Sequence, residues 1–92
     1  MPHPDPATGV PDGALVLDVG HRAGALGEAF PGAVWVRLED LAAGDLPPAL
    51  LEHPTDAPVV VVCAYGLRSR GAATLLRAEG WTDVREVAAI AR

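Results

Sequence analysis

The hydrophobic positions of the chain fall into short, uninterrupted runs. Residues 59–62 are four consecutive valines, and residues 15–19 are apolar apart from Asp18. Runs of β-branched residues without alternation are typical of strands that are buried on both faces, as in the interior of a parallel sheet. A shorter run at residues 33–36 predicts a further strand, and residues 84–87, which have a valine at each end, predict a last short one. The pattern therefore predicts a small central parallel sheet of four to five strands, with residues 59–62 in its middle.

Between these runs the apolar residues recur at helical spacing, which predicts helices that separate the strands. The clearest helical pattern is followed by Gly80, a residue type that commonly stops helices. A shorter pattern carries Pro47 and Pro48 in its first turn, where proline is tolerated. The predicted helical segments are residues 21–30, 39–43, 46–53 and 69–78. Strands that alternate with helices predict an α/β domain whose helices flank the sheet.

The length of 92 residues fits one small domain. The first 13 residues are rich in proline, glycine and aspartate, and they carry too few apolar residues to bury a core of their own. The sequence thus predicts a flexible N-terminal arm at residues 1–13 and a single domain at residues 14–92. A domain of this size buries only about 60% of the surface of its unfolded chain, so its stability should be modest.

The charge and the cysteine content exclude several kinds of partner and site. The net charge is −5 and the chain has no lysine, so we expect no binding to nucleic acid or to an anionic membrane. No apolar run approaches the roughly 18 residues that cross a bilayer, and no secretory signal is apparent after Met1. A single cysteine excludes an internal disulfide and a zinc site built from several cysteines, and it fits a reducing compartment. We therefore expect a cytoplasmic protein.

The only cysteine, Cys63, stands where the run of valines ends. Open α/β sheets bind ligands outside the carboxyl ends of their strands. The residues after Cys63 lead directly into a predicted helix, so their N–H groups are free to form a cup around the sulfur. Gly66 allows a positive φ in such a curl, Arg68 adds a permanent positive charge at the rim, and Ser69 is predicted to cap the helix. A cup of this kind, at the positive end of a helix, lowers the pKa of a thiol.

A cysteine at the end of a strand also has a simpler explanation. Free cysteine is among the most buried residue types and often serves as a small hydrophobic side chain. An inert cysteine, however, would not need a glycine two residues before an arginine and serine at a helix start. The flanking residues favour Cys63 as a nucleophile.

The predicted central strand and the loop after it resemble the active-site loop of the rhodanese family of sulfurtransferases, on the motif Cys63-x-x-Gly66-x-Arg68-Ser69. Two further pieces fit the family in order and spacing. Its strand that ends in an aspartate is similar to residues 17–19, and its Pro-Gly-Ala turn with the next strand is similar to residues 30–38. The resemblance runs from about residue 14 to residue 87.

The resemblance implies a rhodanese-like fold and a thiosulfate-type sulfurtransferase. Cys63 would accept a sulfane sulfur from a small anionic donor such as thiosulfate, or from a protein persulfide partner, and pass it to a thiol or cyanide-like acceptor. Arg68 would steer the anionic donor, and Asp18 would organise the loop. No metal or organic cofactor is implied, and the oligomeric state stays open. The residues expected to bind the substrate are Ala64, Tyr65, Gly66, Leu67, Arg68 and Ser69.

Two other interpretations are available. Cysteine phosphatases use a similar cup, but their cysteine and arginine are separated by one residue more than Cys63 and Arg68 are. They also have a histidine before the cysteine, where this chain has Val62. Both differences argue against phosphatase or arsenate chemistry. The second alternative is a rhodanese-like module that carries sulfur or docks a regulatory partner with little or no turnover. Ala64, where many family members have a basic residue, favours the module, whereas Cys63 followed by Gly66 and Arg68 favours an enzyme.

Overall fold

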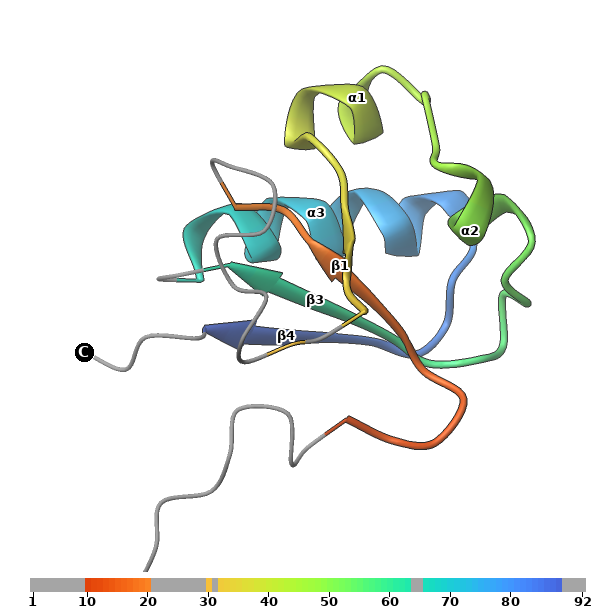
Figure 1. Ribbon diagram of the computed structural model, residues 1–92. Coiled ribbons are helices and arrows are strands. Elements are labelled where there is room, and N and C mark those ends of the chain that lie inside the picture. Colours follow the sequence, from red (N-terminus) through yellow and green to blue (C-terminus); the bar gives the residue numbers. More distant parts are fainter. Residues whose placement is uncertain (1–9, 21–29, 31, 64–65, 89–92) are drawn as a thin grey trace, which may run out of the picture.

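The computed structural model describes residues 10–20, 30, 32–63 and 66–88. These residues form, in chain order, β1 (Leu15–Asp18), β2 (Val34–Trp35), α1 (Leu38–Ala42), α2 (Pro48–Leu51), β3 (Val59–Cys63), α3 (Leu67–Glu79) and β4 (Val84–Ala88) (Figure 1). The four strands predicted from the sequence are confirmed, and so are three of the predicted helices. Residues 21–29 of the fourth predicted helix lie outside the described residues. No helix in the described ranges is long and apolar enough to span a bilayer.

The strands form one sheet in the order β2-β1-β3-β4, and every strand pair is parallel. At the carboxyl end of the sheet, Asp18 of β1 lies opposite Val62 of β3, and Cys63 lies opposite Ala88 of β4. The interior position of β3 confirms what its run of buried valines predicts. From β1 the chain continues to one edge of the sheet and from β3 to the other, so the strand order reverses between these two strands. Parallel sheets bind ligands outside the carboxyl ends of strands at such a reversal.

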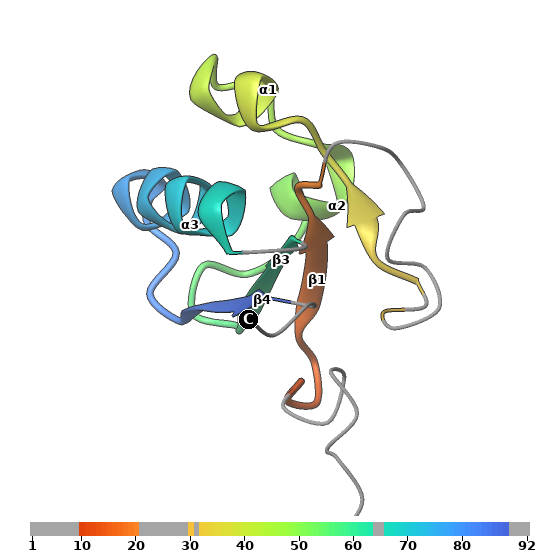
Figure 2. The ribbon, with the colours of Figure 1, turned by 90° about the vertical axis from the view of Figure 1, so that its left-hand side faces the viewer.

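The side chains of β3 alternate between two apolar clusters, one on each face of the sheet. Val59, Val61 and Cys63 belong to the larger cluster, and Val60 and Val62 belong to the smaller one. All three described helices pack on the face of the larger cluster, α3 alongside β3 and β4 (Figure 2). The helices contribute Leu41, Leu50, Ala72, Ala73 and Leu76 to it. This packing brings the N-terminal end of α3 to the end of β3, on the face where the side chain of Cys63 lies.

Glycines define both ends of α3. Gly66 is its N-cap with φ of 86°, and Gly80 is its C-cap with φ of 116°; a left-handed backbone of this kind costs other residues roughly 1–2 kcal/mol. The helix therefore begins at Leu67, two residues earlier than the apolar pattern predicts. The prediction that Ser69 caps the helix is wrong, because Ser69 lies inside the first turn.

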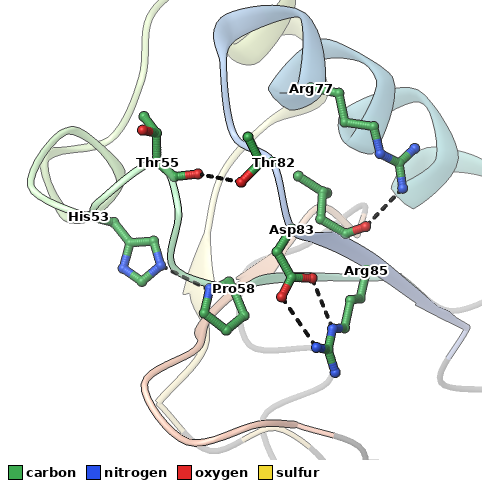
Figure 3. Close-up of polar contacts among 8 residues, drawn as sticks. His53, Thr55, Pro58, Arg77, Thr82, Asp83 and Arg85 are labelled. Atoms are coloured by element: carbon green, nitrogen blue, oxygen red, sulfur yellow. Dashed lines mark hydrogen bonds and ion pairs between the residues drawn. The ribbon is translucent and has the colours of Figure 1, made fainter.

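Polar contacts stabilise the amino-terminal end of the sheet, where β3 and β4 begin (Figure 3). Arg77 near the end of α3 donates to the carbonyl oxygen of Val84 at 2.8 Å. Nε2 of His53 lies 2.9 Å from the carbonyl oxygen of Pro58, the residue before β3. The contact of Arg77 joins α3 to β4 at the end far from Cys63, so it helps to hold the helix in place along the sheet.

Candidate active site

Cys63 ends β3 with its sulfur beside the first turn of α3. The residue is 3% exposed and carries a free thiol. The N–H of Gly66 donates to Sγ at 3.0 Å, and the N–H of Ser69 donates to it at 3.4 Å. Both groups belong to the end of a helix where N–H groups have no partner within the helix. Two of the amides that the sequence places around the sulfur are therefore in contact with it.

The side chain of Ser69 adds a third contact to the sulfur. Ser69 is fully buried, and its Oγ lies 3.5 Å from Sγ of Cys63 and 3.1 Å from the carbonyl oxygen of Gly66. A hydroxyl has one hydrogen and two lone pairs. In the thiol state, Oγ accepts the S–H of Cys63 and donates to Gly66; once the sulfur is ionised, the same hydrogen can rotate to the thiolate. Ser69 thus contacts the nucleophile through both its N–H and its hydroxyl.

These surroundings lower the pKa of the Cys63 thiol. Burial raises this pKa, because it disfavours the charged form. The hydrogen bonds of Ser69, from its hydroxyl and its N–H, together with the N–H groups of Gly66 and Arg68, outweigh burial and lower the pKa below the ordinary value of a cysteine. The thiolate is the reactive form of cysteine, so the site favours a nucleophile even though the residue belongs to the apolar core.

The guanidinium of Arg68 forms an ion pair with a residue of α1. Its Nη1 lies 3.6 Å from Oε1 of Glu39, and Oε2 of the same carboxylate lies 3.4 Å from Nε of Arg37. The Arg68 side chain is 32% exposed and that of Glu39 is 60% exposed, so the pair lies at the surface beside the start of α3. The positive charge expected at the rim is therefore paired with the carboxylate of Glu39. Sequence reasoning missed Glu39 because only the packing of α1 on α3 brings it to Arg68.

Asp18 lies at the carboxyl end of β1 and is 3% exposed. Its Oδ1 accepts the N–H of Gly20 at 2.8 Å, and the indole N–H of Trp35 donates to the carbonyl oxygen of Gly20 at 3.1 Å. Asp18 is in register with Val62, and successive residues of a strand point to opposite faces, so its side chain leaves the sheet on the face opposite to that of Cys63. Within the described residues Asp18 shapes the turn after β1, and its expected role in organising the cysteine loop stays a prediction.

The other expected binding residues divide into two groups. Leu67 opens α3 and is 78% exposed, whereas Ala64 and Tyr65 lie outside the described residues. Among the residues that the structure describes, no three metal-ligating side chains cluster together. The expected site residues that the structure brings together at the end of β3 are Cys63, Gly66, Arg68 and Ser69.

Comparison with known proteins places this site in a family. A sequence model described as a rhodanese-like domain matches residues 11–89. The chain belongs to the rhodanese-like domain family. This membership confirms the resemblance seen in the loop motif and the two supporting segments. A search of curated protein sequences gives no match.

Solved structures share the rhodanese-like fold. The human single-domain sulfurtransferase TSTD1 is 30% identical with a TM-score of 0.64, over 86% of this chain and 78% of that one. A rhodanese homologue from the extremely thermophilic bacterium Thermus thermophilus is 32% identical with a TM-score of 0.61, over 84% of this chain and 78% of that one. The Rhodanese_3-like domain of the Alr3790 protein from Anabaena sp. is 23% identical with a TM-score of 0.59, over 83% of both chains. The parallel four-stranded sheet with flanking helices is therefore a rhodanese-like fold.

Proposed function

We propose that the protein is a sulfurtransferase in which Cys63 carries sulfane sulfur as a persulfide. The observation that carries the proposal is the set of hydrogen bonds from the first turn of α3 to Sγ, which favours the thiolate. A persulfide anion on Cys63 would lie at the same helix end, where free N–H groups and the helix dipole favour negative charge. Membership of the rhodanese-like family supports the proposal, as does the similarity to a human single-domain sulfurtransferase.

The reaction has two half-reactions. The Cys63 thiolate attacks the outer sulfur of thiosulfate; a new S–S bond forms, the S–S bond of the donor breaks, and sulfite leaves with the bonding electron pair. A nucleophilic acceptor such as cyanide then attacks the outer sulfur of the persulfide. The persulfide bond breaks, thiocyanate forms, and the thiolate is regenerated. A protein persulfide as donor and a thiol as acceptor follow the same exchange.

The proposed cellular compartment follows from the need for a reduced Cys63. A nucleophile that must be reduced at the start of each cycle works in a reducing compartment, so we place the protein in the cytoplasm. A net charge of −5 without lysine argues against nucleic acid or an anionic membrane as a partner. The partners proposed are a small anionic or protein-bound sulfur donor and a thiol or cyanide-like acceptor.

A carrier module without turnover is the alternative that one observation favours: the rim charge of Arg68 is already engaged by Glu39. Thiocyanate formation from thiosulfate and cyanide separates the two functions. The proposed enzyme forms thiocyanate with many turnovers per protein, and Cys63→Ser forms none above the uncatalysed rate. Sulfur uptake on Cys63 with no more than one turnover would identify the carrier, and turnover that persists in Cys63→Ser would contradict both.

A further inference from the structure

The site that Cys63 forms is not uniformly positive at its rim. The backbone N–H of Arg68 is one of the hydrogen-bond donors that lower the pKa of the Cys63 thiol. The guanidinium of Arg68 instead forms an ion pair with Glu39 at 3.6 Å. Glu39 is in turn held from the other side by Arg37 at 3.4 Å. The three side chains together carry one net positive charge, whereas the two arginines without Glu39 would present two positive charges to an incoming ligand.

The position of Glu39 is set by packing between α1 and α3. Leu38, the residue before it, lies over Gly71 of α3: a Cβ on Gly71 would be 3.7 Å from the nearest Leu38 methyl carbon. Leu41 of α1 is buried in the same core cluster as Ala72 of α3. The α1 helix is therefore anchored next to the first turns of α3, so Glu39 is presented to Arg68 by the fold.

We propose that Glu39 sets the charge selectivity of the site by occupying Arg68, so that the rim disfavours dianionic sulfur donors such as thiosulfate relative to donors of lower charge such as persulfides. The proposal rests on the proposed function for the identity of the ligand, but its charge argument concerns any anion that approaches Cys63. A dianion must either displace the Glu39 carboxylate from Arg68 or bind beside it. Glu39 is thus a positioning residue that acts through Arg68.

The test compares two alkylating reagents that are similar in size but differ in charge. Iodoacetate carries a negative charge and iodoacetamide is neutral; both react with the Cys63 thiolate and release iodide. Because both need the same thiolate, the ratio of their rate constants cancels the thiol pKa and reports the electrostatics of the approach. Glu39→Gln should raise the iodoacetate-to-iodoacetamide ratio about two- to fivefold, the range for an exposed charge pair. In 1 M salt, where the Debye length is about 3 Å, the difference should shrink.

Matched variants give the result its meaning. Asp40→Asn removes the same charge from the next residue of α1 and should leave the ratio within about 1.5-fold of wild type, because an exposed charge that is not paired with Arg68 is largely screened. In an Arg68→Gln background, Glu39→Gln should have no effect, since a coupling between two residues vanishes when one is removed. With thiosulfate as donor, Glu39→Gln should lower KM about two- to fivefold with kcat unchanged.

The outcomes separate this inference from the proposed function. The inference would be overturned if Glu39→Gln and Asp40→Asn changed the reagent ratio equally. It would also be overturned if Glu39→Gln changed the ratio in the Arg68→Gln background, or if neither reagent labelled Cys63 in the wild type. A shifted reagent ratio in a protein that takes up no sulfur from any donor would leave the charge selection standing and remove the sulfurtransferase.

Discussion

Replacing Ser69 with alanine tests whether the first turn of α3 stabilises the Cys63 thiolate. The variant removes a hydroxyl that lies 3.5 Å from Sγ and leaves the N–H donors of Gly66 and Ser69 in place. Because this hydrogen bond favours the charged form, its loss should raise the pKa of the Cys63 thiol. The substitution also removes the hydroxyl that donates to the carbonyl oxygen of Gly66, so the fold of the variant is checked by circular dichroism.

The distance between Oγ of Ser69 and Sγ sets the expected loss of free energy. A hydrogen bond to a charged group contributes about 1.5–3 kcal/mol, and a contact of 3.5 Å is long, so we expect a loss of about 1 kcal/mol. At pH values below both titration midpoints, this corresponds to about a fivefold smaller thiolate fraction. A thiolate of higher pKa is intrinsically more nucleophilic, with a Brønsted slope of about 0.4–0.5, so the alkylation rate should fall only about 2.5-fold.

Thiolate absorbance and the rate of iodoacetamide alkylation are measured against pH for wild type, Ser69→Ala and Thr74→Ala. Thr74 is the matched control, because its hydroxyl belongs to the same helix and donates to the carbonyl oxygen of Arg70 at 3.1 Å. The midpoint should move to higher pH in Ser69→Ala and stay unchanged in Thr74→Ala. A midpoint in Ser69→Ala at or below that of wild type would refute the reasoning.

Three further predictions concern stability. Gly66→Ala forces a φ of 86° on a residue with a Cβ, so urea titration should show a loss of about 1–2 kcal/mol in the free energy of unfolding; an unchanged value would contradict the left-handed N-cap. Leu50→Ala empties a position that is fully buried and should cost about 2–5 kcal/mol, whereas a cost below about 1 kcal/mol would mean that α2 is not packed on the sheet. The folded-state pKa of Cys63 is lowered, so its ionisation stabilises the fold above the unfolded pKa of about 8.5, and this contribution is lost as pH falls through the folded pKa. The stability difference between wild type and Cys63→Ser should therefore grow with pH up to about 8.5, and a difference that does not change with pH would contradict the lowered pKa.

The elements that the sequence predicts well are those whose pattern depends on burial. The valines of β3 have no polar alternation, and this is a direct consequence of a strand enclosed on both faces. The left-handed backbone at Gly66 was also predictable, because a glycine between the end of a strand and a predicted helix is a local feature. The position of Cys63 at the carboxyl end of an interior strand follows from these two observations together.

The errors and omissions depend on geometry that no local pattern contains. Serine is a common N-cap, which suggested that Ser69 begins the helix, but the left-handed Gly66 starts it earlier and turns Ser69 inward to the sulfur. Glu39 is separated from Arg68 in the sequence by α2 and β3, and an exposed acidic residue on a short helix has no distinguishing signal in the sequence. Its role becomes visible only when the two helices are packed together.

The central claim is that Cys63 carries sulfur on a thiolate held by the first turn of α3. Its most direct test is the intact mass of the reduced protein after incubation with thiosulfate, and separately with a low-molecular-weight persulfide. We predict a gain of one sulfur atom that cyanide removes, that Thr74→Ala retains and that Cys63→Ser abolishes. Wild-type protein that gains no sulfur from either donor, or a Cys63→Ser variant that gains as much as wild type, would contradict the account.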